Sequence, residues 1–324
     1  MQHALAYRTS AVLFAAVDLD VFTTLAAGPR SAAEIARACG GRDEPVRLLL
    51  EACVAADLLA REGDCYANTP IGDAFLVRGG PAYSANGFKY AEDLYPAWGR
   101  LGDLVRTGRP PMPPETILGD DKDKTRAFVL AMHERARGIG SVLPHIVDLK
   151  GRRHLLDVGG GPGTYSVELV QNNPGLRATV LDVPGVLEVT RELVDASGFA
   201  DRVRLVPGDY LKSPFGSGFD AALLSGMMHR ETPAACTLLL TKAFDALDRG
   251  GLVIVSDVFF DDDSKRTPPF AVYFALNMML TSAHGSAHAK TEMAAWMRDV
   301  GFTDVQVREL PKPNPHALVI GTKP

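Results

Sequence analysis

The hydrophobic pattern changes character before the middle of the chain. Before about residue 110, apolar residues recur at helical spacing, as in 4–25, 43–59 and 88–108. From residue 154 onwards, short apolar runs alternate with helix-like segments. This alternation predicts an α/β fold with a doubly wound, mainly parallel sheet and helices on both faces. The predicted strands are LLDV at 155–158, ATVLDV at 178–183, VRLVPGD at 203–209, FDAALLSG at 219–226, GLVIVSDV at 251–258, and a final pair at 305–310 and 316–322.

The first part of the chain has the pattern of a small helical domain. Ser31, with Glu34 three residues later, forms a capping-box signature for a helix that ends at Gly40. A second helix is predicted over 43–59, and two short extended runs around a turn at 62–64 predict a hairpin. Two helices and a hairpin form a winged-helix-like pattern. The second helix carries one arginine against several acids, so we expect it to serve packing or dimerisation rather than base readout.

A proline-rich segment separates this domain from the rest of the chain. Residues 109–115 read RPPMPPE and predict a rigid connector, and 124–149 predict a long helix leading into the second half. We therefore expect three parts: a winged-helix-like dimerisation domain over 1–110, a linker helix region over 111–150, and an α/β domain over 151–324.

Composition narrows the class of protein. The chain has 324 residues and a net charge of −5, which argues against nucleic acid as a partner. No apolar run approaches the roughly 18–20 residues that span a bilayer. The N-terminus lacks a basic stretch and is interrupted by Asp18 and Asp20, so we expect no signal peptide and no membrane. Four scattered cysteines predict reduced thiols in a cytoplasmic protein.

The segment 155–182 carries the clearest chemistry. It reads LLDVGGGPGTYSVELVQNNPGLRATVLD: an apolar run containing Asp157, a glycine-dense turn, a helix-like stretch, and a second run ending in Asp182. Such a strand–turn–helix–strand unit offers backbone N–H groups at a helix N-terminus and a carboxylate for ribose hydroxyls. The sequence therefore predicts a site for a nucleoside-containing cofactor.

The residues around the glycines indicate which cofactor this is. Gly159 and Gly161 fit the first two positions of the dinucleotide pattern GxGxxG, but Thr164 stands at the third. Asp157, two residues before the first glycine, would repel a pyrophosphate but suits the ammonium of an amino-acid moiety. A tight turn alone would explain the glycines, but it would not explain an acid at this position.

Two further positions complete the argument. Asp182 lies 25 residues after Asp157, where it can accept hydrogen bonds from a ribose diol. Asp209 and Tyr210 follow the third strand and can reach an adenine amino group and cover its ring. This set of residues favours S-adenosylmethionine (SAM) over NAD.

With these motifs, nearly the whole chain resembles the class I SAM-dependent methyltransferases. More narrowly, it is similar to the plant-type small-molecule O-methyltransferases and their bacterial natural-product relatives. The resemblance implies a dimer formed through the N-terminal domain, with a SAM-binding catalytic domain over 151–324. The cofactor residues expected are Asp157, Gly159 and Gly161 for the methionine end, Asp182 for the ribose, Asp209 for the adenine, and Val183, Tyr210 and Ser225 as further contacts.

A general base is expected just after the fourth strand. Methyl transfer to a hydroxyl needs a positioned acceptor and a group that takes its proton. The resembling enzymes use a histidine in a His-Asp-Trp context; here His229 is followed by Arg230 and Glu231. Asp257 ends the fifth strand 28 residues later. A carboxylate bonded to one ring nitrogen sets the tautomer that leaves the other nitrogen free as the base.

The largest departure from the family lies before the last catalytic-domain helix. The family carries Gly-Gly-Lys-Glu-Arg-Thr there, whereas 285–290 read GSAHAK, so His288 stands at the glutamate position, and we expect it to assist the base. Together with His133, His229 and His284 it could form a divalent-metal site. No ligand motif with strong spacing supports this, and we predict no metal.

The acceptor site is expected to be lined by the linker helix and the apolar segment 268–285. Most of the aromatic and methionine residues of that segment fit an ordinary core at helical spacing. In the family this helix lines the acceptor site, so a few of them should face a flat, apolar acceptor. The candidates are Met132, His133, Phe274, Asn277, Met278 and His284, with Phe270 and Tyr273 as further apolar positions.

These observations favour a homodimeric SAM-dependent methyltransferase that acts on a small, fairly apolar acceptor through an oxygen nucleophile. Methyl transfer to carbon, nitrogen or sulfur with the same SAM site, assisted by a metal on the histidines, is the second hypothesis. The third is a winged-helix regulator that senses SAM, and the absence of a basic recognition helix argues against it.

Overall fold

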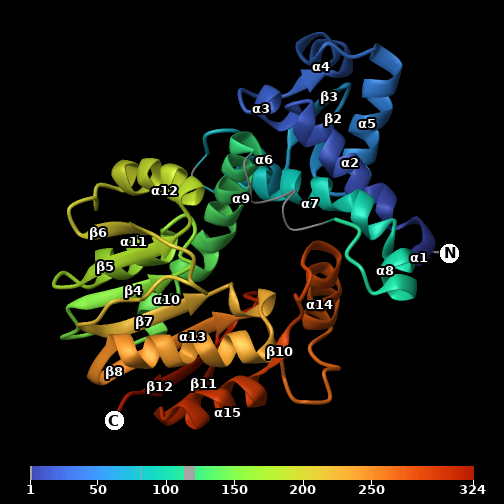
Figure 1. Cartoon of the computed structure of the whole chain (residues 1–324). Coiled ribbons are helices and arrows are strands. Elements are labelled where there is room, and N and C mark those ends of the chain that lie inside the picture. The colour runs from blue at the N-terminus through green and yellow to red at the C-terminus, as the bar shows by residue number, and fades with distance from the viewer. Residues whose placement is uncertain (1, 81, 113–120) are drawn as a thin grey trace. The chain divides into compact units, whose positions relative to one another are not determined.

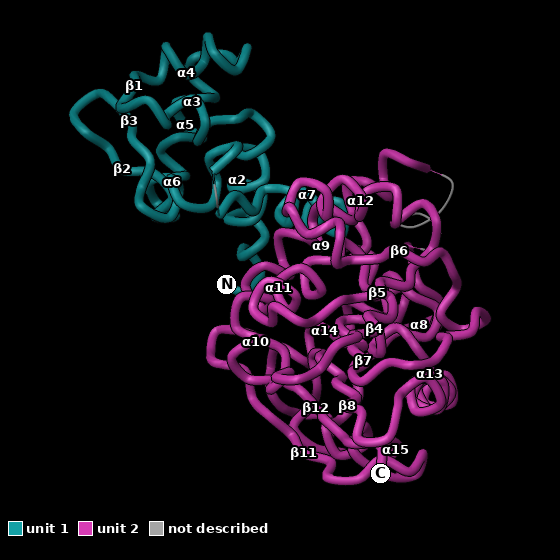
Figure 2. Tube along the Cα trace, turned by 90° about the vertical axis from the view of Figure 1, so that its left-hand side faces the viewer, with its two compact units in different colours: residues 1–95 teal, residues 96–324 magenta. Residues whose placement is uncertain are grey.

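The computed structural model describes residues 2–80, 82–112 and 121–324. The chain divides into two compact units, residues 1–95 and 96–324 (Figure 2). The predicted division differs, because it ends the first domain at 110 and sets 111–150 apart. In the structure α9 (Lys122–Gly140) packs against α11 (Thr164–Asn172) and α12 (Pro184–Ser197), so the linker helix belongs to the second unit.

The first unit is a helical domain with a small sheet. Its elements are α1 (Gln2–Leu5), α2 (Tyr7–Asp18), α3 (Val21–Leu25), β1 (Arg30–Ser31), α4 (Ala32–Cys39), α5 (Asp43–Ala55), β2 (Leu59–Glu62), β3 (Cys65–Asn68), α6 (Pro70–Leu76) and most of α7 (Ala85–Trp98). The predicted capping box and hairpin are confirmed: Ser31 accepts a hydrogen bond from the Glu34 amide, and β2 pairs antiparallel with β3.

Two helix predictions in this unit were too long. The apolar stripe over 4–25 forms three helices, and the left-handed backbone of Asp20, with φ of 55°, separates α2 from α3. The helix predicted over 43–59 ends at Ala55, because Asp57 is left-handed as well and Leu59 begins β2. Neither break falls at a glycine or proline, the residues that usually signal one.

The second unit contains the doubly wound sheet (Figure 1). Its strands are β4 (His154–Val158), β5 (Arg177–Asp182), β6 (Val203–Pro207), β7 (Phe219–Ser225), β8 (Leu247–Asp257), β11 (Thr303–Glu309) and β12 (Ala317–Thr322). All the predicted strands are confirmed. The order is β11-β12-β8-β7-β4-β5-β6, and β12 runs antiparallel to both of its neighbours.

Helices cover both faces of this sheet. The remaining elements are α8 (Leu101–Thr107), α10 (Leu143–Ile146), the 3₁₀ turn η2 (Met228–Arg230), α13 (Pro233–Ala246), β9 (Phe259–Phe260), α14 (Pro269–Thr281), β10 (His288–Ala289) and α15 (Lys290–Val300). The predicted helix over 88–108 is split between α7 and α8, and that over 124–149 between α9 and α10. The connector is described only up to Met112, so its end lies outside the described residues.

The two cores follow from the alternation of side chains along each strand. Leu155 and Leu223 point to the face covered by α9 to α12, whereas Leu156 and Leu224 point to the face covered by α13 and α15. Figure 1 shows these two helical layers on either side of the sheet. The interior strands β4 and β7 are buried on both faces and almost continuously apolar, as interior parallel strands are.

The sheet topology determines where a ligand can bind. The chain runs outwards from β4 to β6 and then returns to place β7 on the other side of β4. Strand order therefore reverses between β4 and β7, and α/β sheets bind ligands beyond the carboxyl ends of the strands at such a switch point. Asp157, Asp182 and Ser225 all lie in the carboxyl-terminal parts of these strands.

Candidate active site

The glycine turn after β4 is held against the tip of β5. The Gly161 amide donates to Oδ2 of Asp182 at 2.8 Å, and the Val183 amide donates to Oδ1 at 2.7 Å. Burial raises the pKa of Asp182, and these two hydrogen bonds oppose that shift. Gly159 and Gly161 have φ of 61° and 52°, so both need glycine. The turn thus fixes the Asp182 carboxylate beside the start of α11.

Asp157 is the most unusual acid in the second unit. Its side chain is fully buried; Oδ2 accepts a hydrogen bond from the Ser166 hydroxyl at 2.7 Å, whereas Oδ1 has no hydrogen-bonding partner. Burial raises its pKa to about 7, the Ser166 hydroxyl opposes the shift and the Asp182 charge adds to it. A buried carboxylate oxygen without a partner is costly unless a ligand pairs with it. The ammonium of an amino acid meets that need.

The loops after β6 and β7 approach the same turn. A Cβ placed on Gly159 would lie 3.5 Å from the Tyr210 ring and 3.6 Å from Met227, so these side chains flank the glycine. The Tyr210 hydroxyl donates to Glu231 at 2.7 Å. Asp209 directly precedes Tyr210. Its carboxylate forms an ion pair with Lys212 at 2.9 Å, which lowers the pKa of Asp209.

His229 and Asp257 meet at the tips of β7 and β8. The imidazole Nδ1 lies 2.7 Å from Oδ1 of Asp257, and the His229 amide donates to Oδ2 at 3.1 Å. Burial acts to raise the pKa of Asp257, but its interaction with His229 lowers it overall. An ionised carboxylate can only accept, so Nδ1 carries the proton and Nε2 is left as a base.

A second histidine near the ends of β7 and β8 has no signal in the sequence pattern and was not predicted. His316 is buried, and its Nδ1 lies 3.1 Å from the Ser256 hydroxyl. Burial lowers its pKa to about 3, so the ring is neutral. The direction of β12 places His316 here: the register pairs Ala317 with Asp257, so an antiparallel strand brings its first residues to this edge of the sheet.

The four histidines considered for a metal site do not share a common centre. His288 Nε2 lies 3.1 Å from the carbonyl oxygens of both Met228 and Glu231, and His133 Nδ1 lies 2.8 Å from the Thr164 hydroxyl. His284 is exposed to solvent. Within the described ranges, no group of three or more His, Cys, Asp or Glu side chains could hold a metal ion.

The helix α14 presents aromatic side chains to the His229 ring. Phe274 meets His229 edge-on with ring centres 4.8 Å apart, and it stacks against Phe270 at 6.3 Å. Met278 is buried beside Phe274, whereas Asn277 Oδ1 accepts a hydrogen bond from the Trp98 indole at 3.0 Å. Tyr273 is 65% exposed, so it is not part of the core. Met132 is half-buried on α9.

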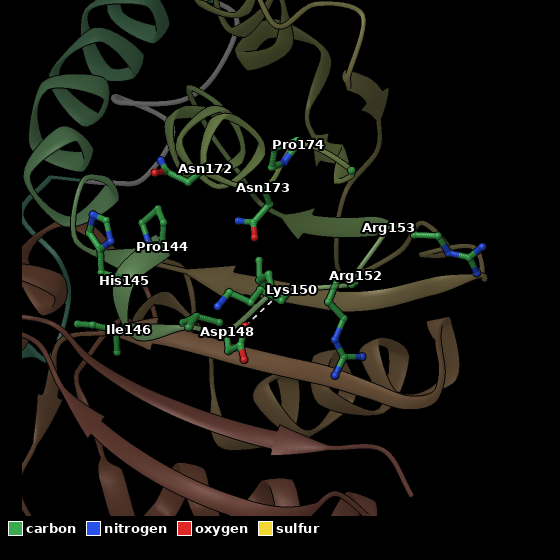
Figure 3. Close-up of a pocket in the computed structure, with 14 residues that line it drawn as sticks. Pro144, His145, Ile146, Asp148, Lys150, Arg152, Arg153, Asn172, Asn173 and Pro174 are labelled. Atoms are coloured by element: carbon green, nitrogen blue, oxygen red, sulfur yellow. Dashed lines mark hydrogen bonds between the residues drawn. The ribbon is translucent and has the colours of Figure 1, made fainter.

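A cavity of about 620 Å³ lies at the other edge of the sheet (Figure 3). It is lined by residues 144–153 and 172–175, which precede β4 and β5. Its lining includes none of the candidate cofactor, catalytic or acceptor residues. This cavity is therefore separate from the group around Asp157 and His229.

Two family models match the chain, and together they span most of it. Residues 98–303 match an O-methyltransferase domain, and residues 1–78 match an O-methyltransferase dimerisation domain. The chain therefore belongs to the O-methyltransferase family and is a SAM-dependent methyltransferase. These matches support methyl transfer to oxygen. They do not favour methyl transfer to carbon, nitrogen or sulfur, nor a regulator that senses SAM.

Relatives and solved structures agree with this assignment. The chain is 32% identical over 96% of its length to the 3-hydroxy-5-methyl-1-naphthoate 3-O-methyltransferase of Streptomyces sahachiroi, covering 91% of that protein. It is 33% identical over its whole length to the tetracenomycin polyketide synthesis 8-O-methyl transferase TcmO of Streptomyces glaucescens, covering 96% of it. Human N-acetylserotonin methyltransferase in complex with SAM superimposes with a TM-score of 0.89 at 26% identity, covering 99% of this chain and 96% of that one. SAM is the cofactor.

Proposed function

We propose that this protein methylates a hydroxyl group on a small aromatic acceptor, and that His229 is the general base. The observation that carries the proposal is the His229–Asp257 pair, 2.7 Å apart at the carboxyl edge of the sheet. Phe274 packs against the imidazole and offers an apolar surface to a flat ring. The S. sahachiroi and S. glaucescens relatives, whose names give a naphthoate and a polyketide, support a small aromatic acceptor.

The chemistry assigned to each residue follows from its position. SAM supplies an activated methyl group on a sulfonium. The acceptor oxygen forms a bond to that carbon as the carbon–sulfur bond breaks, and His229 Nε2 takes the hydroxyl proton. Asp257 holds the imidazole in the right tautomer and stabilises its charged form. Apart from the proton on His229, the products are the methyl ether and S-adenosylhomocysteine.

The cofactor assignment rests on the group around the glycine turn. Oδ1 of Asp157 would pair with the ammonium of SAM, and Asp182, fixed by two amides, would accept hydrogen bonds from the ribose hydroxyls. Gly159 lets the cofactor approach the backbone beside Tyr210. Asp209, Val183 and Ser225 are assigned as further contacts from their places at the same strand ends.

For His288 we propose a positioning role rather than proton transfer. Carbonyl oxygens only accept, so Nε2–H donates to the carbonyls of Met228 and Glu231, and burial lowers the pKa of His288, which favours the neutral ring. Met228 begins the short turn that carries His229, and Glu231 directly follows that turn. The Trp296 ring meets His288 edge-on at 5.0 Å and restrains it further. A neutral donor fixing the turn replaces the glutamate that resembling enzymes carry at this position.

The first unit is proposed to join two copies of the chain into a homodimer. It contains the residues that match the dimerisation domain, and α4, α5 and the β2–β3 hairpin follow each other as in a winged helix. Ile71 and Phe75 of α6 and Leu48 of α5 are large apolar side chains exposed on this unit. No helix within the described residues is long and apolar enough to cross a membrane.

The experiment is to compare His229→Ala and Asp257→Asn with the unaltered protein. Turnover of a naphthol panel would be followed by S-adenosylhomocysteine release and by the mass of the ether product. We expect kcat to fall by about 10²–10⁴-fold in each variant. SAM affinity measured by calorimetry should change less than about twofold, because neither side chain belongs to the cofactor group. Unchanged turnover in His229→Ala would refute the assignment.

A further inference from the structure

One basic side chain near His229 has no role in the chemistry described above. Arg135 lies on α9, is exposed to solvent, and holds its guanidinium carbon 5.6 Å from the centre of the Phe274 ring. No carboxylate among the described residues forms an ion pair with it. Arg126, nine residues earlier on the same helix, is paired with Glu192 at 2.8 Å. Arg135 is thus a cation without an ion-pair partner in the described part of the chain.

The Phe274 ring connects this cation to the base. One distance, 5.6 Å, joins the Arg135 guanidinium to the ring, and another, 4.8 Å, joins the ring to the His229 imidazole. Together they limit the separation of guanidinium and imidazole to about 10 Å. Allowing for a hydrogen bond at each end, one or two fused aromatic rings can fill that span.

Two rings that interact electrostatically with Arg135 are neutral. Burial raises the pKa of Tyr165 to about 12, and the Arg135 charge opposes that shift. His316 is neutral because it is buried. A guanidinium beside an apolar ring and without an ion-pair partner can bind an anion from outside. Its planar fork matches the two oxygens of a carboxylate.

Resting on the proposed function, we infer that Arg135 binds a carboxylate on the acceptor, so that the substrate class is the hydroxyaryl carboxylic acids. The acceptor ring would lie along Phe274, with its hydroxyl at His229 and its carboxylate at Arg135. Arg135 is then the residue that distinguishes acids from neutral phenols, and it takes no part in the transfer of the methyl group or the proton.

A binding experiment tests this inference without any turnover. 1-Naphthoate and 1-naphthamide, which differ in charge but hardly in shape, would be titrated into the S-adenosylhomocysteine-bound protein in a calorimeter. We expect the naphthoate to bind at least tenfold more tightly than the amide. In Arg135→Met that preference should fall roughly tenfold or more, because a charge-assisted bidentate contact is lost. Arg126→Met removes the same charge from the same helix and should leave the preference unchanged.

The outcomes separate this inference from the proposed function. His229→Ala should lose turnover but keep the preference for naphthoate over naphthamide. If His229 proves not to be the base, the binding result for Arg135 is therefore unaffected. Arg135→Lys should retain only part of the preference, since a lysine cannot form the fork. Equal binding of naphthoate and amide to the unaltered protein, or an equal loss of both in Arg135→Met, would overturn the inference.

Discussion

Oδ1 of Asp157 has no hydrogen-bonding partner, and this leads to a prediction about how SAM affinity depends on pH. Burial raises the pKa of this carboxyl to about 7, so in the cofactor-free protein it is largely protonated below that pH. Only the ionised form can pair with the ammonium of SAM. Binding must therefore strengthen as pH rises through 7 and weaken as pH falls, with a proton released on binding at low pH.

The size of this pH effect on SAM affinity follows from the ionised fraction of the Asp157 carboxyl. With a pKa of about 7, roughly a tenth of the carboxyl groups are ionised at pH 6.0 and about three quarters at pH 7.5. The ionised fraction of Asp157 alone makes the apparent Kd for SAM about eightfold weaker at pH 6.0 than at pH 7.5. The ordinary pKa of an α-amino group is about 7.7–8.0, so part of the ligand loses its charge by pH 7.5, and the net change in Kd should be roughly five- to sixfold.

Calorimetry in two buffers of different ionisation enthalpy would measure both the Kd and the number of protons released. Asp157→Asn is the matched control: the amide still accepts the Ser166 hydrogen bond but cannot ionise. We expect it to bind SAM roughly 30-fold or more weakly, as when one partner of a buried charge pair is lost, and with a flatter pH dependence. An unaltered protein whose SAM affinity is constant from pH 6.0 to 7.5, or an equal slope in Asp157→Asn, would refute the reasoning.

Two further variants test other parts of the site. His288→Leu removes the imidazole donor that the Met228 and Glu231 carbonyls share, so the free energy of unfolding should fall by roughly 1–3 kcal/mol and kcat by about tenfold, with SAM affinity unchanged. His288→Gln, which can still donate, should recover most of kcat, and no recovery would contradict the positioning role. Gly160→Ala would place a Cβ 2.7 Å from Cγ of Asp157, so SAM affinity should fall at least tenfold and stability by roughly 1–3 kcal/mol. Gly175→Ala, whose Cβ meets nothing within 4 Å, is its control, and equal calorimetric and thermal unfolding results for the two alanine variants would count against this geometry.

Most of the second unit could be predicted because its signals are local. Leu155 and Leu156 are adjacent in the sequence and buried on opposite faces, so a continuous apolar run was enough to indicate an interior parallel strand. The acids Asp157 and Asp182 follow such runs, and parallel strands bring their ends to one edge. Sequence order alone therefore placed the cofactor candidates near one another; their individual roles remain predictions.

What the sequence did not reveal depends on contacts between distant segments. His316 reaches Ser256 only because β12 runs antiparallel beside β8, and nothing in the apolar run HALVIGT indicates its direction. His288 was expected to assist the base, but its ring nitrogen is committed to two backbone carbonyls that no side-chain pattern announces. Arg135 looks like any basic residue on a solvated helix until Phe274 is placed beside it.

The position of β12 between β11 and β8 has a consequence for biosynthesis. The strand that ends in Asp257 pairs with β7 on one side and with residues 317–322 on the other. While the chain is being made, β8 stays an unprotected edge until residues 317–322 have left the ribosome, and such edges invite pairing with other chains. Nascent chains stalled before this hairpin should therefore be prone to aggregate and lack an assembled catalytic centre.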